Sequence, residues 1–185
     1  LQNHKSLLFE TSSLYSLSEF IAPMNTWSDN CRAELLALCL TRKICGKADY
    51  RLLDTSLKKI FKQHHLEVKS LIAADGSGLS RRDRISAADL TAIMTKMYNS
   101  AKCQDFHNSL AVAAKKGTLR KRFTNSFFDG KLHAKTGTLD GVSSLSGFFF
   151  HRDDKYSLSL LCNGPSNKEI WKALEKFSAS LHFLE

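Results

Sequence analysis

A change of hydrophobic period near residue 130 is the feature that most constrains the fold of this chain. Before this point, apolar residues such as Leu53, Leu57 and Ile60 recur at the three- and four-residue spacing of one helix face. After it, apolar residues alternate with serines over residues 155–162, which is the period of a half-buried strand. Helices that precede a run of strands predict an α+β fold, with helices packed on an antiparallel sheet.

Capping residues indicate where several of the helices begin. Ser16 and Glu19 form a capping-box pattern, and Ser86 and Ser166 stand before apolar helical runs in the same way. We expect helices over residues 16–24, 33–40 (with a stop at Gly46), 50–61, 90–97 and 109–114 (with a stop at Gly117). A short strand is expected at 69–74, and three further strands over 132–136, 144–150 and 155–162. The last helix has Ile170, Leu174, Phe177 and Leu181 on its apolar face.

The composition fits one domain with a basic surface. The 185 residues carry a net charge of +9, which is compatible with a solvated surface or with an anionic partner such as nucleic acid, a membrane or a cell-wall polymer. The basic residues are scattered and accompany no nucleic-acid-binding signature, so we expect no nucleic-acid partner. No apolar run approaches the ~20 residues that span a bilayer. The sequence begins at Leu1 and shows no signal peptide, so we expect a processed or excerpted chain.

The metal-binding residue types lack the spacing of a metal site. The five cysteines contain no C-x-x-C pair, and the seven histidines show no H-E-x-x-H pattern. We therefore expect no metal and no cofactor. Most cysteines are interpreted as small buried hydrophobic residues, and His64 with His65 as a helix end.

Two short motifs carry candidate chemistry. The triplet Ser28–Asn30 (S-D-N) precedes a predicted helix, and alone it is typical of an N-terminal cap. The segment Lys135–Thr138 (K-T-G-T) ends a predicted strand, and alone it is typical of an edge strand with a turn. In this order they match the second and third of the three signatures S-x-x-K, S-D-N and K-T-G of the serine penicillin-recognising enzymes. Further blocks extend the match over residues 75–81, 117–123, 134–142 and 144–147.

This series resembles the class C, low-molecular-mass penicillin-binding proteins, which are D-alanyl-D-alanine carboxypeptidases and endopeptidases, over residues 17–162. The resemblance implies the serine β-lactamase/penicillin-binding, transpeptidase-like fold, an antiparallel sheet flanked by helices. Residues 1–185 would be the C-terminal portion of one such domain, with its first two strands and its nucleophile helix absent. It also implies peptidoglycan stem peptides as substrates, β-lactams as covalent inhibitors of the complete enzyme, and a periplasmic or extracytoplasmic location.

Acyl transfer at a D-Ala-D-Ala bond explains why the two motifs contain these residue types. The hydroxyl of Ser28 can relay a proton to the leaving amine, and the amide of Asn30 can hold the substrate backbone and the catalytic lysine. The ammonium of Lys135 can steer the terminal carboxylate and lower the pKa of neighbouring groups. We therefore predict that Ser28 and Lys135 lie on opposite walls of one cleft.

The remaining candidate residues are assigned to substrate binding. Thr136 belongs to the motif strand, Gly137 allows a close approach of the substrate backbone, and the hydroxyl of Thr138 can bind the carboxylate. By resemblance, the backbone N–H of Thr138 is half of the oxyanion hole. The resemblance also implies that the segment 75–80 borders the cleft, with contacts from Ser77, Leu79 and Arg81, the last to an acidic peptide side chain.

The S-x-x-K signature, which supplies the nucleophile in this family, has no match before Ser28. Its one literal match, residues 56–59, follows the S-D-N triplet, and we interpret it as the solvated face of the predicted helix 50–61. We therefore expect the nucleophile from a missing N-terminal segment of the same protein or from another chain. The alternative is an inactive module that binds a cell-wall peptide or a β-lactam on the same scaffold. Without the missing strands, the strand 155–162 would be an exposed apolar edge.

Two positions depart from the family's pattern. Asp83 stands where an Asn is often found, and residues 114–116 (Ala-Lys-Lys) stand where Gly and an acidic residue are usual.

Overall fold

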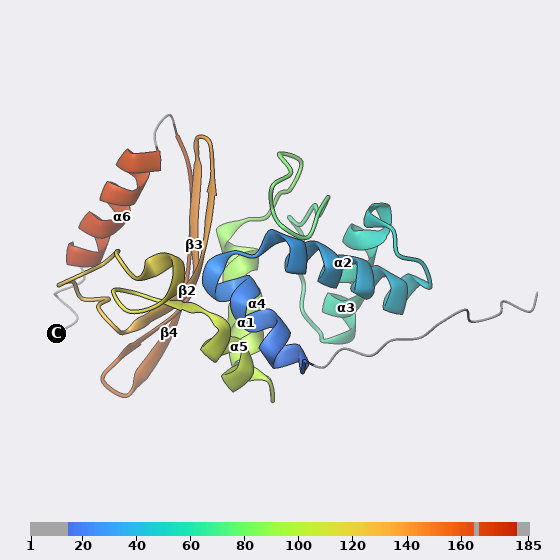
Figure 1. Cartoon of the computed structure of the whole chain (residues 1–185), viewed down its shortest axis with the longest axis horizontal. Helices are drawn as coiled ribbons and strands as arrows, with labels where there is room; N and C mark the ends of the chain where they lie inside the picture. Colours follow the sequence, from blue (N-terminus) through green and yellow to red (C-terminus); the bar gives the residue numbers. More distant parts are fainter. Residues whose placement is uncertain (1–14, 165–166, 181–185) are drawn as a thin grey trace, which may run out of the picture.

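The computed structural model describes residues 15–164 and 167–180, so the predicted cap at Ser166 and the predicted apolar position Leu181 lie outside the described residues. Helices form the first part of the chain, and a sheet with one further helix forms the second, as the α+β prediction required (Figure 1). The elements are α1 (Leu17–Trp27), α2 (Asn30–Cys45), the 3-10 turn η1 (Tyr50–Leu52), α3 (Leu53–Gln63), α4 (Ala87–Tyr98), α5 (Cys103–Ser109), β1 (Ala111–Val112), the 3-10 turn η2 (Gly117–Leu119), β2 (Leu132–Leu139), β3 (Val142–His151), β4 (Asp154–Asn163) and α6 (Asn167–Ser180).

The predicted caps at Ser16 and Ser86 and the predicted stop at Gly46 are confirmed. Ser16 and Glu19 form both hydrogen bonds of a capping box at the start of α1. The hydroxyl of Ser86 accepts a 3.0 Å hydrogen bond from a backbone N–H in the first turn of α4. Gly46 ends α2 in the left-handed region, with φ 76°, which glycine adopts without steric cost.

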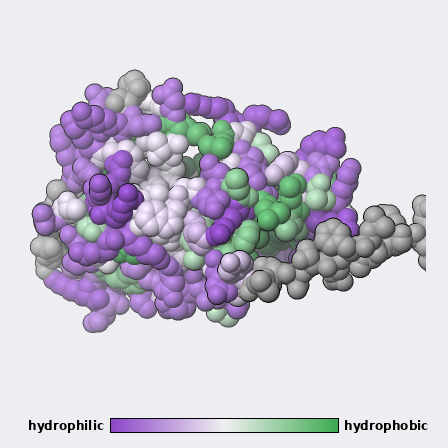
Figure 2. Space-filling view, viewed as in Figure 1, coloured by the Kyte–Doolittle hydropathy of each residue, from purple (hydrophilic) through white to green (hydrophobic). Residues whose placement is uncertain are grey.

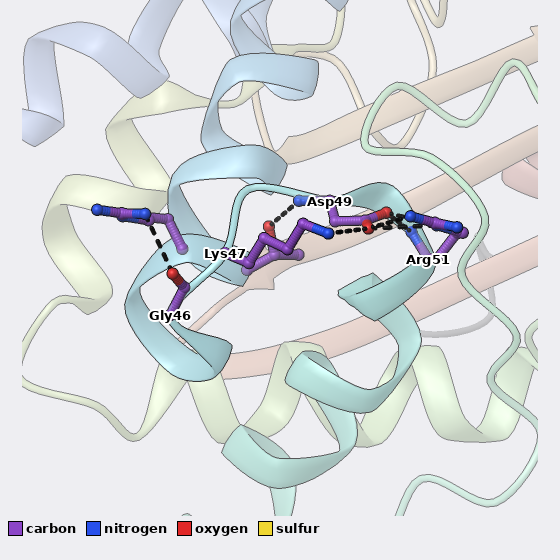
Figure 3. Close-up of polar contacts among 6 residues, drawn as sticks. Gly46, Lys47, Asp49 and Arg51 are labelled. Carbon is purple, nitrogen blue, oxygen red and sulfur yellow. Dashed lines mark hydrogen bonds and ion pairs between the residues drawn. The ribbon is translucent and has the colours of Figure 1, made fainter. Parts of the chain in front are cut away.

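The turn between α2 and α3 is held by an exposed charge cluster (Figure 3). Asp49 accepts a 2.7 Å hydrogen bond from Arg51 and lies 3.7 Å from the ammonium of Lys47. The hydrogen bonds from the Arg51 side chain and backbone lower the pKa of Asp49 to about 2. The cluster therefore stays charged at neutral pH and fixes the course of the chain into η1.

The sheet has the strand order β1-β2-β3-β4, and each neighbouring pair is antiparallel. The three strands expected from the sequence are confirmed and are longer than predicted, because pairing continues to the turns on both sides. The register places Lys135 of β2 opposite Ser146 of β3. The short strand β1, which pairs with residues 133–134, was not anticipated.

Two predicted elements are wrong. Residues 69–74 form no strand, since only a single bridge joins Ile72 to Arg84. The helix expected near residues 109–114 ends at Ser109, and the next residues extend to form β1. Pairing with β2 there outweighs the helix propensity of a run that contains three alanines.

Successive side chains of β3 face opposite sides of the sheet and join two separate cores. Leu145 and Phe149 pack with Trp171 and other residues of α6. Phe148 packs with Met94 of α4 on the other face. Figure 1 shows this arrangement, with α6 on one side of the sheet and the helices α1–α5 on the other.

β4 is the far edge of the described sheet. Leu161 of this strand is 36% exposed. An open, partly apolar edge of this kind is a site where a further strand can pair.

Candidate active site

Ser28 lies at the junction of α1 and α2, and Asp29 is the helix cap. The side chain of Asp29 accepts a 3.1 Å hydrogen bond from the backbone N–H of Arg32, so the N-cap function falls on Asp29 and not on Ser28. Ser28 itself ends α1 with φ 62°, a left-handed conformation that is uncommon for serine. Its hydroxyl is therefore not used for capping.

The end of α1 is anchored to α5. Thr26 donates a 2.7 Å hydrogen bond to the carbonyl of Ser109, and the amide of Asn25 donates one of 2.7 Å to its hydroxyl. All three residues are buried, so these bonds form away from water and hold the junction firmly. Ser28 thus occupies a fixed position relative to the sheet.

Lys135 of β2 reaches across to this junction. Its ammonium donates hydrogen bonds to the hydroxyl of Ser28 and to the carbonyl of Thr136, the latter at 2.6 Å. Burial lowers the pKa of Lys135 from its ordinary value, because a charge is less stable away from water. The two motifs, 107 positions apart, therefore meet at one hydrogen bond, and both residues line the same cavity, as predicted.

This cavity, of about 480 Å³, lies between β2 and the loop 75–80. It is lined by every candidate residue except one, namely Ser28, Asn30, Ser77, Leu79, Lys135, Thr136, Gly137 and Thr138. The exception is Arg81, whose guanidinium donates a 2.8 Å hydrogen bond to the carbonyl of Asp140 in the β2–β3 turn. Arg81 lines a neighbouring cavity of about 740 Å³.

The edge of β2 that faces this cavity is open. Leu132 accepts a 2.9 Å hydrogen bond from the N–H of Ala113 on this side, and main-chain groups alternate sides along an antiparallel strand. The N–H and C=O groups of Thr136 and Thr138 therefore point to the same side. Because β1 pairs only with residues 133–134, these groups have no strand partner within the described residues. The two N–H groups and the Thr138 carbonyl are available to a peptide that binds as an added strand, whereas the Thr136 carbonyl already accepts a hydrogen bond from Lys135.

Gly137 also leaves room for a side chain of the neighbouring strand. A Cβ atom at this position would collide with the hydroxyl of Ser144 on β3. The absence of a side chain thus serves the β2–β3 contact in addition to any approach of a ligand to the strand.

Carboxylates shape the loop that forms the other wall. Asp75 accepts 2.6 Å hydrogen bonds from the N–H groups of Gly78 and Ser80, and Glu34 of α2 accepts one of 3.0 Å from the N–H of Ser77. A Cβ atom on Gly76 would lie 2.5 Å from the Ala33 carbonyl, so only glycine allows the loop to pack this closely on α2. Asp75 and Gly76 therefore have structural roles, which supports the turn interpretation for these two positions.

Asp83 supports the same loop with one carboxylate oxygen in an unfavourable environment. Its Oδ1 accepts a 2.6 Å hydrogen bond from the N–H of Ala74, while its Oδ2 is buried with no partner in the described part of the chain. Burial, together with the neighbouring Asp75, raises the pKa of Asp83. The departure from the usual Asn thus places two carboxyl groups side by side under the cleft.

A second, mostly apolar groove of about 580 Å³ runs along α1, α2 and α3 and reaches the cleft. Ser28, Asn30 and Lys135 line its inner end, and apolar residues of the three helices line the rest, among them Met24, Leu36, Leu40, Leu53 and Leu57. Figure 2 shows hydrophobic side chains gathered at the surface over α2. The groove is an apolar channel that ends at the Ser28–Lys135 contact.

The literal S-x-x-K match does not lie on a solvated face, contrary to our prediction. Ser56 is 0% exposed and packs against α2, where its hydroxyl lies 3.3 Å from the sulfur of Cys45. Lys59, three residues further along α3, is exposed. Ser56 is therefore buried against α2 and lines neither the cleft nor the apolar groove described above.

The cysteine prediction is also wrong. All five cysteines are free, Cys31 and Cys39 are exposed, and the other three are only partly buried. None is fully buried, and of the five only Cys162 is among the residues that pack against the main hydrophobic core of the described chain. Among the described residues, no group of three or more potential ligands could hold a metal ion, and none of the described helices is long and apolar enough to cross a membrane.

Two stacked histidines, His107 of α5 and His133 of β2, lie beside the site. The ring centroids of His107 and His133 are 4.0 Å apart, and within the described residues the buried atoms His133 Nδ1 and His107 Nε2 have no hydrogen-bond partner. The pKa of His133 is lowered to about 4, mainly by burial and further by the nearby His107 and Lys116. Both rings are therefore neutral at pH 7.

Sequence reasoning assigned no role to several residues that shape the site. Glu34 and Asp83 hold the loop wall, and Thr118, Arg122 and Trp171 line the cavity beside β2. Thr118 and Arg122 belong to a sequence block that was recognised without a role, whereas no local signal marks Trp171.

Known proteins resemble this chain in sequence and in fold. Residues 2–181 match the family model described as D-Ala-D-Ala carboxypeptidase 3 (S13). The D-alanyl-D-alanine carboxypeptidase of Actinomadura sp. (strain R39) is 28% identical over 155 residues, which are 81% of this chain and 29% of that protein. The penicillin-sensitive carboxypeptidase A of Dictyostelium discoideum is 43% identical over 75 residues, 40% of this chain and 14% of that protein.

Solved structures give the same result for the fold. Penicillin binding protein 4 of Haemophilus influenzae superposes with a TM-score of 0.78 at 23% identity, over 89% of this chain and 38% of that one. A predatory endopeptidase of Bdellovibrio bacteriovorus, solved with its immunity protein, superposes with a TM-score of 0.71 at 15% identity, over 89% of this chain and 43% of that one. The chain thus has the penicillin-binding, transpeptidase-like fold, and it spans between 14% and 36% of the length of the curated relatives it matches.

Proposed function

Because the chain belongs to the D-Ala-D-Ala carboxypeptidase 3 (S13) family, we propose that it forms two walls of the acyl-transfer site of a serine D-Ala-D-Ala carboxypeptidase or endopeptidase. The observation that carries this proposal is the contact between Lys135 and Ser28 beside the open edge of β2. The substrate is a peptidoglycan stem peptide, β-lactams are covalent inhibitors, and the work is done outside the cytoplasm, in the periplasm or its equivalent, where that polymer lies.

In this proposal Ser28 passes a proton to the leaving amine. Its oxygen accepts a hydrogen bond from the Lys135 ammonium, so its own O–H is free to point into the cleft. The lowered pKa of Lys135 makes the ammonium a better proton donor to the hydroxyl. Asn30, at the start of α2, lines the same cavity and holds the substrate backbone.

The open edge of β2 binds the substrate in this proposal. The N–H of Thr138 points to the unpaired side and would donate to the developing oxyanion. The backbone of the peptide extends the sheet at Thr136–Thr138, and Ser77 and Leu79 contact it from the opposite wall. One N–H of the Arg81 guanidinium donates to the Asp140 carbonyl. The remaining N–H groups of Arg81 would contact an acidic side chain of the peptide.

The nucleophile comes from a segment that precedes Leu1 in the same protein, and residues 1–185 are the C-terminal portion of one domain. The apolar groove supports this, because it runs along three helices and ends at Ser28, Asn30 and Lys135. An amphipathic helix packed in such a groove buries its apolar face and can present a serine and a lysine at the inner end. The open edge of β4 is where a strand of the same segment would pair.

The alternative function is a cell-wall peptide or β-lactam binding module without a nucleophile. Its supporting observation is that the literal S-x-x-K match is buried at Ser56, away from the cleft. Such a module would keep the open edge of β2 and would bind ligands without forming an acyl-enzyme.

Intact-mass measurement with benzylpenicillin separates the two functions. We expect the full-length gene product to gain one penicillin mass on a serine upstream of Leu1, and residues 1–185 alone to gain none. Acylation at Ser56 would contradict the assignment of the nucleophile. Reversible binding of a D-Ala-D-Ala peptide by a full-length protein that is never acylated would establish the binding module instead.

A further inference from the structure

We propose that Arg122, held against Trp171, is the residue that binds the C-terminal carboxylate of the substrate. The inference rests on the proposed function and names the group that recognises a free carboxyl terminus. Arg122 lines the main cavity beside β2 and also a second cavity of about 390 Å³ between β2 and α6. Thr138 lines both, so the two cavities meet at the end of the motif strand.

The guanidinium of Arg122 is held in place by its surroundings. Its carbon lies 3.9 Å from the ring centroid of Trp171, which is 5% exposed. The backbone of Arg122 is fixed as well, because its N–H donates a 2.9 Å hydrogen bond to Leu119 and its carbonyl accepts one of 2.9 Å from Ala114. A planar cation that is already ordered loses little entropy when it forms a paired hydrogen bond with a carboxylate.

The charge of Arg122 has no direct partner in the described part of the chain. None of the ion pairs there involves its guanidinium, which stacks on the ring of Trp171. Burial lowers the pKa of Arg122, and Glu175 partly offsets that effect from a distance. The 390 Å³ cavity is also lined by Lys168 and Lys172, so cations outnumber the single carboxylate of Glu175. This end of the cleft therefore attracts an anion.

Lys135 is turned away from this end. Side chains alternate along β2, so Lys135 faces the helices while Thr136 and Thr138 face α6 and Arg122. Two of the three protons of the Lys135 ammonium are used by Ser28 and by the Thr136 carbonyl. Thr136 gives its hydroxyl proton to Thr118 at 2.9 Å. The groups left to donate to a carboxylate are the hydroxyls of Thr118 and Thr138 and the guanidinium of Arg122.

The site thus divides two tasks that sequence reasoning gave to one residue. Lys135 acts on the proton path through Ser28, and Arg122 recognises the carboxylate from the opposite face of the strand. Trp171 is a positioning residue, which acts only by holding the Arg122 side chain.

The test compares the acylation of the full-length protein by benzylpenicillin and by its methyl ester, which lacks the carboxylate charge. We expect Arg122→Gln to slow acylation by the acid about 10- to 100-fold and by the ester less than about threefold. Arg122→Lys keeps the charge and loses the planar fork, so its effect on the acid should be intermediate. Trp171→Phe keeps a stacking face and should slow the acid less than Arg122→Gln does.

Arg120 provides the matched control. It lies two residues away, also stacks on a tryptophan, 5.3 Å from the ring of Trp27, and lines neither cavity. Arg120→Gln should leave both rates within about twofold of the wild type. If Arg122→Gln slowed acid and ester equally, at an unchanged melting temperature, Arg122 would not be the carboxylate ligand.

Failure of the proposed function gives a different result. A wild-type protein that neither compound acylates would refute acyl transfer, whatever Arg122 does. The same variants would then be compared by equilibrium binding of an N-acylated D-Ala-D-Ala peptide and of its C-terminal amide. Weaker binding of the acid alone by Arg122→Gln would support the carboxylate site, and equal binding of acid and amide by the wild type would overturn it.

Discussion

The hydrogen bond between Lys135 and Ser28 predicts that the two residues act as one unit in acylation. We expect Lys135→Met and Ser28→Ala each to slow acylation of the full-length protein by benzylpenicillin, and the double variant to be little slower than the worse single variant. The physical reason is that either change breaks the same contact, so the second change has little left to remove.

The size of the effect follows from the bonds that are lost. Lys135→Met removes two charge-assisted hydrogen bonds, to Ser28 and to the Thr136 carbonyl, each worth about 1.5–3 kcal/mol. A loss of about 3–4 kcal/mol in the transition state slows acylation roughly 100- to 1,000-fold. Ser28→Ala removes one of these bonds together with the relay proton, so we expect a slowing of roughly 30- to 300-fold.

The assay is a double-mutant cycle on second-order acylation rates, measured with a fluorescent penicillin. We expect a coupling energy of about 2 kcal/mol between the two positions. Ser77→Ala serves as the control, because Ser77 lines the same cavity without contacting Lys135. If the double variant showed the product of the two single effects, the residues would act independently and the proton path through Ser28 would be refuted.

Melting temperatures show whether a slower variant in this cycle is simply less folded. Burial lowers the pKa of Lys135, so the charged form costs stability in the folded protein at neutral pH. Lys135→Met should therefore leave the melting temperature equal to or above that of the wild type while activity falls. A large drop in melting temperature would mean that the loss of rate reflects unfolding.

Three further predictions concern stability and are measured by unfolding in urea. His133 has a folded pKa of about 4, below its ordinary value of 6.5, so it should contribute roughly 1–3 kcal/mol to a loss of stability as the pH falls from 6.5 to 4; His133→Phe should reduce this loss, to which His107 also contributes, and His64→Gln at an exposed position should leave it unchanged. Gly117 has φ 67° and no room for a Cβ beside the Thr26 carbonyl, so Gly117→Ala should cost about 2–4 kcal/mol, whereas Gly78→Ala, at φ 77° in open space, should cost about 1 kcal/mol. Burial and Asp75 raise the pKa of Asp83, so Asp83→Asn should stabilise the protein at pH 7 and lose that advantage as the pH falls towards 4; an equal gain at both pH values would contradict a charge effect.

The predictable part of the fold was the part with a long periodic signal. Each of the three predicted strands has seven or more paired residues. The alternation over 155–162 correctly predicted which side chains of the last strand pack against the core. The caps at Ser16 and Ser86 were predictable because the hydrogen bond they make is local. These features depend on neighbours within four residues of the sequence, so one sequence is enough to recognise them.

The missed features depend on distant partners. β1 is two residues long, too short for any period, and it exists only because residues 133–134 pair with it. The segment 69–74 is apolar, yet the carboxylates of Asp54 and Asp83 take its N–H groups in place of a neighbouring strand. The stacking of Arg122 on Trp171 joins the loop after η2 to α6 across 49 positions, which no local pattern records.

The two interpretations of the S-D-N triplet are complementary, because each residue has a different task. Asp29 caps α2 through its side chain, which is the structural interpretation of such a triplet. The cap turns the chain between two helices and leaves Ser28 in a left-handed conformation at the junction. Ser28 makes no cap hydrogen bond, and its hydroxyl oxygen accepts from Lys135. The cap on Asp29 is therefore the condition under which Ser28 is free for chemistry, and the spacing of the motif follows from it.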